Sequence, residues 1–240
     1  MDSLPPISLL MPTYERLQFL PLIHMNLMFM DYPKDKLELV IFDDGDNALI
    51  PEQYWDKFEK ATGINLKYKH DNSQRFSIGY KRNWLCKHCT HNIMAFMDDD
   101  DIYSPSYLAH SYNIMKTGNY GLVGSKDMIC CFIKDDFLLR GFTCETKVQI
   151  HEATMMFTKK YFKAMGGFEN TSQGEGASFI RGMDEGKIGL TDIARVMICV
   201  AHSGNSVSKE DFKGDEFKLI GHHDKLEDSK LKEVLKMVDK

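Results

Sequence analysis

The chain has 240 residues, of which 43% are hydrophobic and 27% charged, and its formal net charge at pH 7 is −5. These values are typical of one folded globular domain and exclude a disordered chain. A mildly acidic balance gives no general reason to bind nucleic acid or an anionic membrane. No run reaches the roughly 18 apolar residues of a membrane span, the N-terminus lacks the basic start of a secretory signal, and six cysteines are too few for a disulfide scaffold, so we expect a cytoplasmic protein.

Apolar runs and amphipathic segments alternate over the first hundred residues. Buried strands are predicted at 7–11, 37–42 and 93–97, with a weaker strand at 64–68. Helices are predicted between them, at 17–30, 51–61 and 79–89. Strands separated by helical patterns of about 10–15 residues indicate βαβ units and a parallel sheet. The predicted fold class is therefore α/β.

The second half of the chain is less regular. A helix is predicted at 106–115, and two long strands at 122–133 and 137–150 with a turn between them. A short helix at 159–165 ends at two glycines, which commonly terminate helices, and a last strand is predicted at 193–201. We expect one domain over residues 1–223, followed by a charged amphipathic helix at 224–240.

Polar residues follow three of the predicted strands. They are 12–16 (Pro-Thr-Tyr-Glu-Arg), 43–46 (Asp-Asp-Gly-Asp) and the four consecutive aspartates 98–101. Ligands of an open parallel sheet bind beyond the carboxyl ends of its strands. Two carboxylates about 4 Å apart repel by roughly 4 kcal/mol near a protein surface, and their oxygens favour Mg²⁺, Mn²⁺ or Ca²⁺ over zinc. The pattern predicts a cation at this edge; a solvated acidic turn is the alternative.

Three cations, Arg75, Lys81 and Arg82, lie close to the start of a predicted helix. A helix N-terminus with basic side chains in its first turns suits a phosphate group. Arg82 could instead only pair with one of the four aspartates. Both interpretations hold if Arg82 bridges the ligand and the aspartates 98–101, which we call the acidic edge.

Four segments in this order resemble the family 2 glycosyltransferases of the GT-A fold: 12–14 (Pro-Thr-Tyr), 43–45 (Asp-Asp-Gly), 79–83 (Gly-x-x-Arg-Asn) and 96–105 (Phe-Met-Asp-Asp-Asp-Asp-Ile-Tyr-x-Pro). The later segments 165–168 (Met-Gly-Gly-Phe) and 174–176 (Gly-Glu-Gly) fit the acceptor half of that family, and the resemblance covers about residues 5–205. The resemblance implies a Rossmann-like, mostly parallel sheet flanked by helices, with a nucleotide-binding half at about 1–104 and an acceptor half at about 105–223. The length and the Gly-Glu-Gly segment also resemble small glycosyltransferases encoded by large DNA viruses, which would act in the host cytoplasm.

The resemblance also implies a role for each matching residue. Nucleotide and donor sugar would be bound by Pro12, Thr13, Tyr14, Glu15, Asp43, Asp44, Lys81, Arg82, Asp98 and Asp99. Asp100 and His202 would bind Mn²⁺ or Mg²⁺, although four aspartates in a row leave the metal ligand open by one position. Glu175 stands where the family usually has the Glu-Asp motif of its catalytic base. Because Gly176 replaces the second acid, Asp184 and Glu185 stay open as alternatives.

These expectations describe a metal-dependent, inverting glycosyltransferase. It would move a sugar from a nucleotide sugar, with UDP favoured over GDP by the family's habit, to a hydroxyl of a glycan or protein acceptor. One alternative is a nucleotidyltransferase, but such an enzyme normally has a Gly-rich phosphate loop after its first strand, and residues 12–20 contain no glycine. The other is a non-catalytic nucleotide- or glycan-binding module on the same fold, which predicts that Glu175→Gln leaves binding unchanged.

Overall fold

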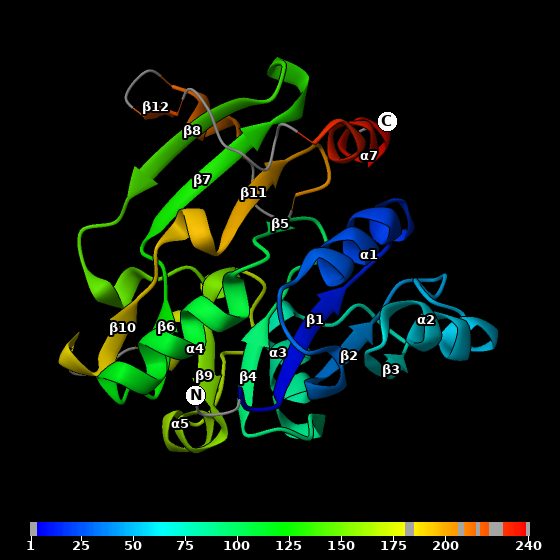
Figure 1. Ribbon diagram of the computed structural model, residues 1–240, viewed down its shortest axis with the longest axis horizontal. Helices are drawn as coiled ribbons and strands as arrows, with labels where there is room; N and C mark the ends of the chain where they lie inside the picture. Colours follow the sequence, from blue (N-terminus) through cyan, green and yellow to red (C-terminus); the bar gives the residue numbers. More distant parts are fainter. Residues whose placement is uncertain (1–3, 181–184, 206–208, 215–216, 221–227, 239–240) are drawn as a thin grey trace.

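The computed structural model of the chain describes residues 4–180, 185–205, 209–214, 217–220 and 228–238 (Figure 1). Within these residues the strands form two sheets. The larger contains β1 (Ile7–Thr13), β2 (Leu37–Asp43), β3 (Asn65–His70), β4 (Ile93–Phe96), β6 (Leu122–Gly124), β9 (Met156–Thr158) and β10 (Ile188–Leu190), in the order β10-β6-β9-β4-β1-β2-β3. The smaller contains β5 (Ile102–Tyr103), β7 (Asp127–Phe132), β8 (Leu138–Thr143), β11 (Met197–Ala201) and β12 (Lys218–Ile220), in the order β12-β8-β7-β11-β5. Figure 1 shows the smaller sheet above the larger one.

Helices cover both faces of the larger sheet. Alternate residues of a strand point to opposite faces, so Leu9 packs in one apolar cluster and Leu10 in the other. The Leu9 cluster includes residues of α1 (Leu20–Phe29) and α4 (Tyr107–Gly118), with α2 (Trp55–Thr62) packed at its margin. The Leu10 cluster includes residues of α3 (Ile78–His88), α5 (Lys159–Met165) and α6 (Ala177–Ile180). Burial on both faces explains why β1 and β2 are nearly continuous apolar runs.

The parallel part of the fold agrees with the sequence prediction. The strands expected at 7–11, 37–42, 64–68 and 93–97 are β1, β2, β3 and β4, and β1 pairs in parallel with both β2 and β4. Thr13 at the end of β1 lies opposite Asp43 at the end of β2. The carboxyl ends of β1, β2 and β4 therefore meet at one edge, and the α/β fold class is confirmed.

The prediction of two long strands in the second half is wrong. The run 122–133 divides into β6 and β7, which belong to different sheets. The chain turns at Ser125, whose backbone N–H donates to Thr154 Oγ1 (2.8 Å) and whose hydroxyl accepts from the N–H of Asp127 (3.1 Å). The run 137–150 forms a strand only as far as Thr143, and a short 3-10 helix with a capping box follows at Lys147–Gln149.

Other boundaries shift in the same way. The strand predicted at 193–201 starts only at Met197, because Ile193–Arg195 forms a 3-10 turn capped by Asp192. The helix predicted at 17–30 begins as the 3-10 turn Leu17–Phe19 and becomes α-helical at Leu20. The short antiparallel strand β9, which joins β4 to β6, was not predicted.

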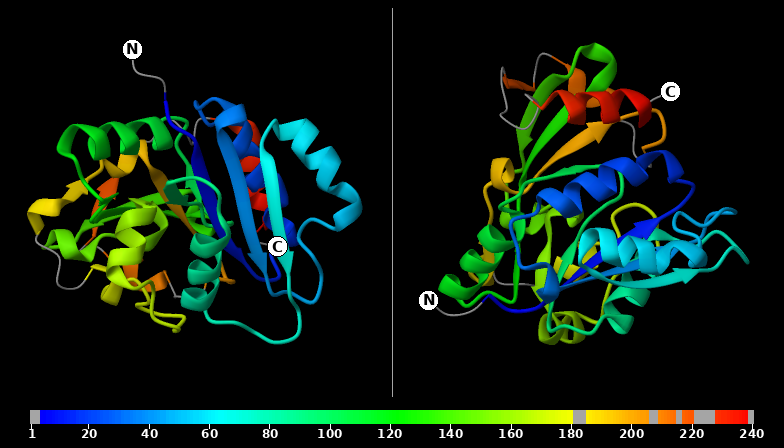
Figure 2. Two further views of the ribbon diagram at one scale, coloured as in Figure 1. Left: turned by 90° about the horizontal axis from the view of Figure 1, so that it is seen from below. Right: turned by 45° about the vertical axis from the view of Figure 1, so that its right-hand side comes forward.

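The C-terminal helix α7 (Ser229–Val238) packs against α1, as the red and blue helices in Figure 2 show. Leu231, Leu235 and Val238 are buried in the same apolar cluster as α1. The rest of the predicted helix, 224–227 and 239–240, and the expected boundary after residue 223 lie outside the described residues. None of the helices in the described part of the chain has the length and apolar character needed to cross a membrane.

Candidate active site

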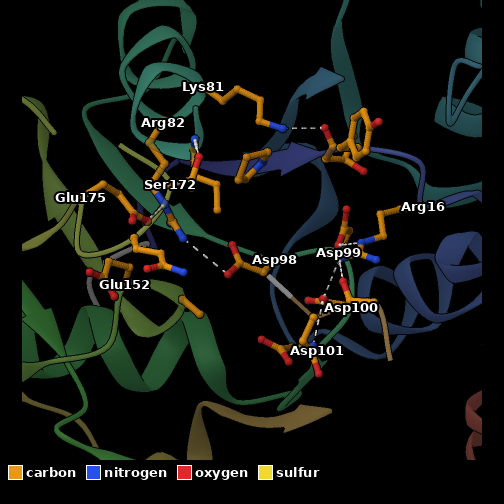
Figure 3. Close-up of a pocket in the computed structure, with 18 of the residues that line it drawn as sticks. Arg16, Lys81, Arg82, Asp98, Asp99, Asp100, Asp101, Glu152, Ser172 and Glu175 are labelled. Carbon is orange, nitrogen blue, oxygen red and sulfur yellow. Dashed lines mark hydrogen bonds and ion pairs between the residues drawn. The ribbon is translucent and has the colours of Figure 1, made fainter. Parts of the chain in front are cut away.

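A cleft of about 670 Å³ lies at the carboxyl edge of the larger sheet (Figure 3). Ten of the predicted site residues line it: Pro12, Thr13, Tyr14, Glu15, Lys81, Arg82, Asp98, Asp99, Asp100 and Glu175. They come from the ends of β1 and β4, from α3 and from the loop before α6. The structure thus brings together residues that are up to 163 positions apart, from Pro12 to Glu175.

Asp43 and Asp44 are buried behind the wall of this cleft. Asp43 accepts hydrogen bonds from the N–H groups of Gly45 (2.9 Å) and Leu49 (2.8 Å) and from the hydroxyl of Tyr68 (2.5 Å). These bonds hold the loop after β2 in shape, because both oxygens of the carboxylate are engaged. The structure therefore places Asp43 where it orders the loop.

Asp44 connects the loop after β2 to the start of α3. Its carboxylate pairs with Lys81 Nζ (2.7 Å) and Arg75 Nη1 (2.9 Å) and accepts from the N–H of Phe76 (2.6 Å). Lys81 also donates to the carbonyl of Thr13 at 2.9 Å. Burial lowers the pKa of Lys81, although Asp44 opposes this shift. Through its contacts with Asp44 and with the carbonyl of Thr13, Lys81 connects the ends of β1 and β2.

Tyr14 presents an exposed aromatic ring at the mouth of the cleft. The guanidinium carbon of Arg75 lies 3.2 Å from the ring centroid, in a cation–π contact. Next to it, Glu15 adopts a left-handed conformation with φ of 51° and accepts from the N–H of Asp46 at 2.5 Å. An exposed ring held in this way offers a flat surface on which another ring can stack.

The four consecutive aspartates have different partners. Asp98 pairs with Arg82 (3.5 Å) and Asp99 with Arg16 (3.6 Å). Asp100 Oδ2 contacts His202 Nε2 (3.0 Å), Arg16 Nη2 (3.5 Å) and Asn205 Nδ2 (3.5 Å). Asp101 turns toward β11 and accepts from the backbone N–H of Val200 at 2.9 Å. All four aspartates line the cleft, but the carboxylate of Asp101 is engaged by the backbone of β11, so Asp98, Asp99 and Asp100 are the candidates for ligand binding.

Neighbouring carboxyls in this run are shifted in opposite directions. Burial, with the charge of Asp100, raises the pKa of Asp99 well above its ordinary value. Burial also disfavours the ionised form of Asp100, but the hydrogen bond from His202 and the charge of Arg16 outweigh it and lower the pKa of Asp100. Carboxyls packed this closely resist simultaneous ionisation unless cations compensate them. The acidic edge is thus suited to a cation.

Asp100 and His202 fit the expected metal, with one adjustment. Their facing atoms are 3.0 Å apart, close to the separation of neighbouring ligands around an octahedral ion with bonds of about 2.1 Å. His202 Nδ1 accepts from the N–H of Gly204 (3.1 Å), so the ring proton lies on Nε2 and is donated to Asp100. Asp100 fits as it stands, and His202 fits once its proton moves to Nδ1. Within the described residues no three acidic, His or Cys side chains form a complete metal site, and Mg²⁺ commonly uses one or two carboxylates with substrate phosphates.

The Gly-x-x-Arg-Asn segment of α3 holds the loop that carries Glu175. Gly79 N–H donates to the carbonyl of Thr171 (2.9 Å), and Asn83 exchanges two hydrogen bonds with the backbone of Phe168 (2.8 and 2.9 Å). A Cβ at position 79 would lie 1.7 Å from the carbonyl oxygen of Glu169, so only glycine permits this approach. The N–H of Ile78 donates to Ser172 Oγ (3.3 Å). The start of this helix therefore binds the loop through its backbone, which leaves phosphate recognition to side chains.

Arg82 lies between the acidic edge and Glu175. Its Nε donates to Glu175 Oε1 at 3.1 Å, and its guanidinium carbon lies 4.1 Å from the centroid of Phe96. Glu175 is only 6% exposed. Burial raises the pKa of Glu175, Arg82 opposes the shift and Glu152 adds to it. A carboxylate whose pKa is raised toward neutrality is a better proton acceptor in catalysis.

Of the three acids considered as the catalytic base, Glu175 lines the cleft. Glu185 is exposed and is not among the residues that line the cleft. Asp184 lies outside the described residues.

Arg16 and Glu152 are among the charged residues that line the cleft and were not assigned a role from the sequence, as is Lys209. Arg16 stood in the polar run after the first strand, where its charge was a usable signal. Glu152 had no such signal: it follows the run 137–150, of which only the first part forms a strand, and lies in the short turn Glu152–Thr154. Figure 3 shows Glu152 beside Glu175 on the Arg82 side of the cleft, and Arg16 on the opposite side with Asp99 and Asp100.

Comparison with known proteins identifies the family. The model of glycosyl transferase family 2 matches residues 8–182, well over half of the chain. The chain therefore belongs to the family 2 glycosyl transferases, as the sequence motifs predicted. No curated protein matches the chain significantly.

Solved structures share the fold. S. aureus TarS 1-349 in complex with UDP-GlcNAc has a TM-score of 0.63 at 18% identity, over 86% of this chain and 63% of that one. The same protein in complex with UDP gives a TM-score of 0.63 at 17% identity, over 82% of this chain and 61% of that one. The mannosyltransferase PcManGT from Pyrobaculum calidifontis, in complex with GDP-Man and Mn²⁺, gives a TM-score of 0.62 at 20% identity. The match covers 87% of this chain and 59% of that one. The chain spans about three fifths of these structures, and the likeness confirms the GT-A fold.

Proposed function

We propose that this chain is a metal-dependent, inverting glycosyltransferase that uses a nucleotide-sugar donor. The observation that carries the proposal is that one cleft holds an acidic strand end, Asp98 to Asp100, and a buried Arg82–Glu175 pair. The family membership and the neighbours solved with UDP, UDP-GlcNAc and GDP-Man support a nucleotide sugar. A UDP sugar is the first donor to test, with GDP sugars beside it.

Unsatisfied polar atoms in the cleft support a polar ligand at its centre. Among the described residues, Arg82 Nη1 and Asp98 Oδ1 are buried without a hydrogen-bond partner. Buried polar atoms normally have partners, and leaving one unpaired costs about 1–3 kcal/mol. The hydroxyls of a donor sugar would supply a donor for Asp98 and an acceptor for Arg82.

The nucleotide would lie toward β1 and β2. We assign its base to the exposed ring of Tyr14, with Pro12, Thr13 and Glu15 around it, and its ribose to Asp99. Lys81, Asp43 and Asp44 would act by shaping this pocket, since their side chains bind one another and the loop backbone.

Mn²⁺ or Mg²⁺ would be held by Asp100 with His202. When bound, such an ion supplies positive charge to the departing diphosphate. Asp100 lies on the far side of the cleft from Glu175 (Figure 3), and His202, which follows β11, contacts Asp100 at 3.0 Å. Opposite placement of leaving group and base is what a single inverting displacement requires.

Glu175 would act as the base. As the acceptor oxygen bonds to the anomeric carbon and the bond from that carbon to the diphosphate breaks, the acceptor's proton passes to the Glu175 carboxylate. Arg82, which donates to Glu175 Oε1, would hold that carboxylate in place. We propose that the acceptor is a hydroxyl of a glycan or a protein.

The donor site is tested by thermal unfolding with UDP, GDP, CMP and their common sugars, in the presence of Mn²⁺, Mg²⁺ or EDTA. A ligand at about 100 times its dissociation constant adds about 2.7 kcal/mol of stability. The proposal predicts a metal-dependent increase for one nucleotide and its sugars, and a loss of that increase in Asp100→Asn. A folded protein stabilised by no nucleotide would contradict it.

A further inference from the structure

Arg16 is a cation built into the acidic edge. It follows the left-handed turn at Glu15, and its Nη2 donates to the carbonyl of Gly204 at 2.6 Å. Arg16 also lies 3.6 Å from Asp99 and 3.5 Å from Asp100, and its side chain is only 15% exposed. Figure 3 shows it against both carboxylates. The charge of Arg16 thus compensates part of the negative charge of Asp99 and Asp100.

Arg16 contacts the oxygen that the expected metal would use. Asp100 Oδ2 already faces His202 Nε2 at 3.0 Å and Arg16 Nη2 at 3.5 Å. A divalent ion bound to this oxygen would stand within a few ångströms of the guanidinium, and like charges at such distances repel strongly where water is scarce. Arg16 in this position therefore opposes binding of the ion to Asp100.

Gly204 supports this arrangement from the other side. Its carbonyl accepts from Arg16 and its N–H donates to His202 Nδ1, which keeps the ring proton on Nε2. A Cβ at position 204 would lie 2.7 Å from Arg16 Nη1, so a side chain there would require the end of Arg16 to shift. One turn thus holds both the arginine and the His202 tautomer that does not bind a metal.

We propose that Arg16 is an internal competitor of the divalent ion, so that the ion binds tightly only when a nucleoside diphosphate is present to receive Arg16. The ion pairs to be broken are long, at 3.5 and 3.6 Å, and the 2.6 Å hydrogen bond to the carbonyl of Gly204 must be broken with them. An arginine fork binds phosphate oxygens with two parallel hydrogen bonds. The diphosphate therefore supplies both ligands for the metal and a new partner for the displaced arginine. This inference rests on the metal site of the proposed function.

The test measures the dissociation constant of Mn²⁺ alone, by electron paramagnetic resonance of the free ion, for the natural chain and for Arg16→Gln and Arg16→Met. Both variants remove the charge, and methionine keeps most of the length. We expect Mn²⁺ to bind at least about tenfold more tightly to both variants, because a repelling unit charge beside the ligand is gone. With saturating UDP or GDP, the difference from the natural chain should shrink to within about threefold.

Two controls define the signal. Lys60→Gln removes one positive charge from the exposed face of α2 and should leave Mn²⁺ binding unchanged. Adding Asp100→Asn to Arg16→Gln should abolish the tight Mn²⁺ binding. This result would show that the ion binds at Asp100. Circular dichroism and thermal unfolding confirm that each variant is folded.

The outcomes separate the inference from the proposed function. Equal or weaker Mn²⁺ binding in the folded Arg16 variants would overturn the role of Arg16 while leaving the metal site in place. Absence of Mn²⁺ binding in every form, with and without nucleotide, would overturn both. Tighter Mn²⁺ binding in the Arg16 variants, together with no sugar transfer by the natural chain, would support the inference and count against the proposed glycosyltransferase.

Discussion

Arg82 on α3 and Glu175 in the loop before α6 are joined by a hydrogen bond of 3.1 Å across 93 positions of sequence. The same guanidinium reaches Asp98 at 3.5 Å. One buried arginine therefore connects the acidic strand end to the proposed base. The two interpretations left open from the sequence, an ion pair with an aspartate and a contact to the ligand, are compatible, because Nη1 is buried without a partner among the described residues.

The first prediction concerns the base. Glu175→Gln should lower the rate of sugar transfer by at least about a hundredfold, since a positioned base contributes roughly 10²–10⁴. Donor binding, measured by titration calorimetry, should change little. Glu185→Gln, at an exposed site away from the cleft, is the matched control. A loss of less than about tenfold in Glu175→Gln would show that another group takes the proton.

The second prediction concerns pH. Burial raises the pKa of Glu175 above the ordinary glutamate value of 4.5. A base must be ionised, so transfer should fall as the pH drops through this raised pKa. The negative charge of Glu152 contributes to the shift, so Glu152→Gln should move the acid limb of kcat/KM to lower pH while activity at the plateau persists. If Glu152→Gln instead abolishes transfer at every pH, Glu152 is the base.

The same shift affects stability in a defined direction. Because the folded-state pKa of Glu175 is raised, its protonated form contributes stability that is present below about pH 4.5 and is lost as the pH rises through the folded-state pKa. Glu175→Gln removes the cost of burying the charge. The stability of this variant relative to the natural chain should therefore increase as the pH rises from about 4.5 toward neutrality, as chemical denaturation at several pH values can measure. A stability difference that does not depend on pH would contradict this reasoning.

The third prediction concerns Arg82, which is 4% exposed. Arg82→Met leaves Asp98 and Glu175 without their cation, and breaking a buried pair costs about 3–5 kcal/mol. Urea denaturation should show this loss. Adding Glu175→Gln should restore part of the stability, because one uncompensated carboxylate is removed. If the effects of the two single substitutions simply add in the double variant, the two residues are not coupled.

The fourth prediction concerns the contact between α3 and the loop of Glu175. Gly79→Ala places a methyl group against the carbonyl of Glu169, whose oxygen lies 1.7 Å from the ideal Cβ. Overpacking of this kind costs about 1–3 kcal/mol and should displace Glu175, so transfer should fall more than donor binding. Lys87→Ala, on the exposed end of the same helix, should change neither.

The parallel core could be predicted because its strands carry a strong pattern. The runs that became β1, β2 and β4 are apolar, are bounded by Pro or Asp, and alternate with helices. Their shared carboxyl edge then placed the aspartates of 98–101 near residues 12–14. β9 could not be predicted, because three residues in the middle of a sheet have no period of their own. The break at Ser125 depends on a hydrogen bond that its backbone N–H donates to Thr154 Oγ1, 29 positions away.

The site was predicted unevenly for similar reasons. Residues in the family's motifs could be named, and ten of them line the cleft. Tertiary contacts decide the orientation of the others: Asp43 faces its own loop because Tyr68 and Leu49 donate to it. Glu152 reaches the cleft from a turn without a motif. Sequence reasoning identified the chemistry of the edge but not which side chains compensate each other.

Sugar transfer itself tests the central claim most directly. The natural chain, Glu175→Gln and Asp100→Asn would be incubated with UDP- and GDP-sugars, Mn²⁺ and a panel of glycan and protein acceptors, and both the released nucleoside diphosphate and the glycosylated product would be measured. The account predicts product from one class of donor with the natural chain, loss of product with EDTA, and loss in both variants. A donor that binds to the natural chain but is never cleaved with any acceptor, or transfer that persists in Glu175→Gln and Asp100→Asn, would contradict it.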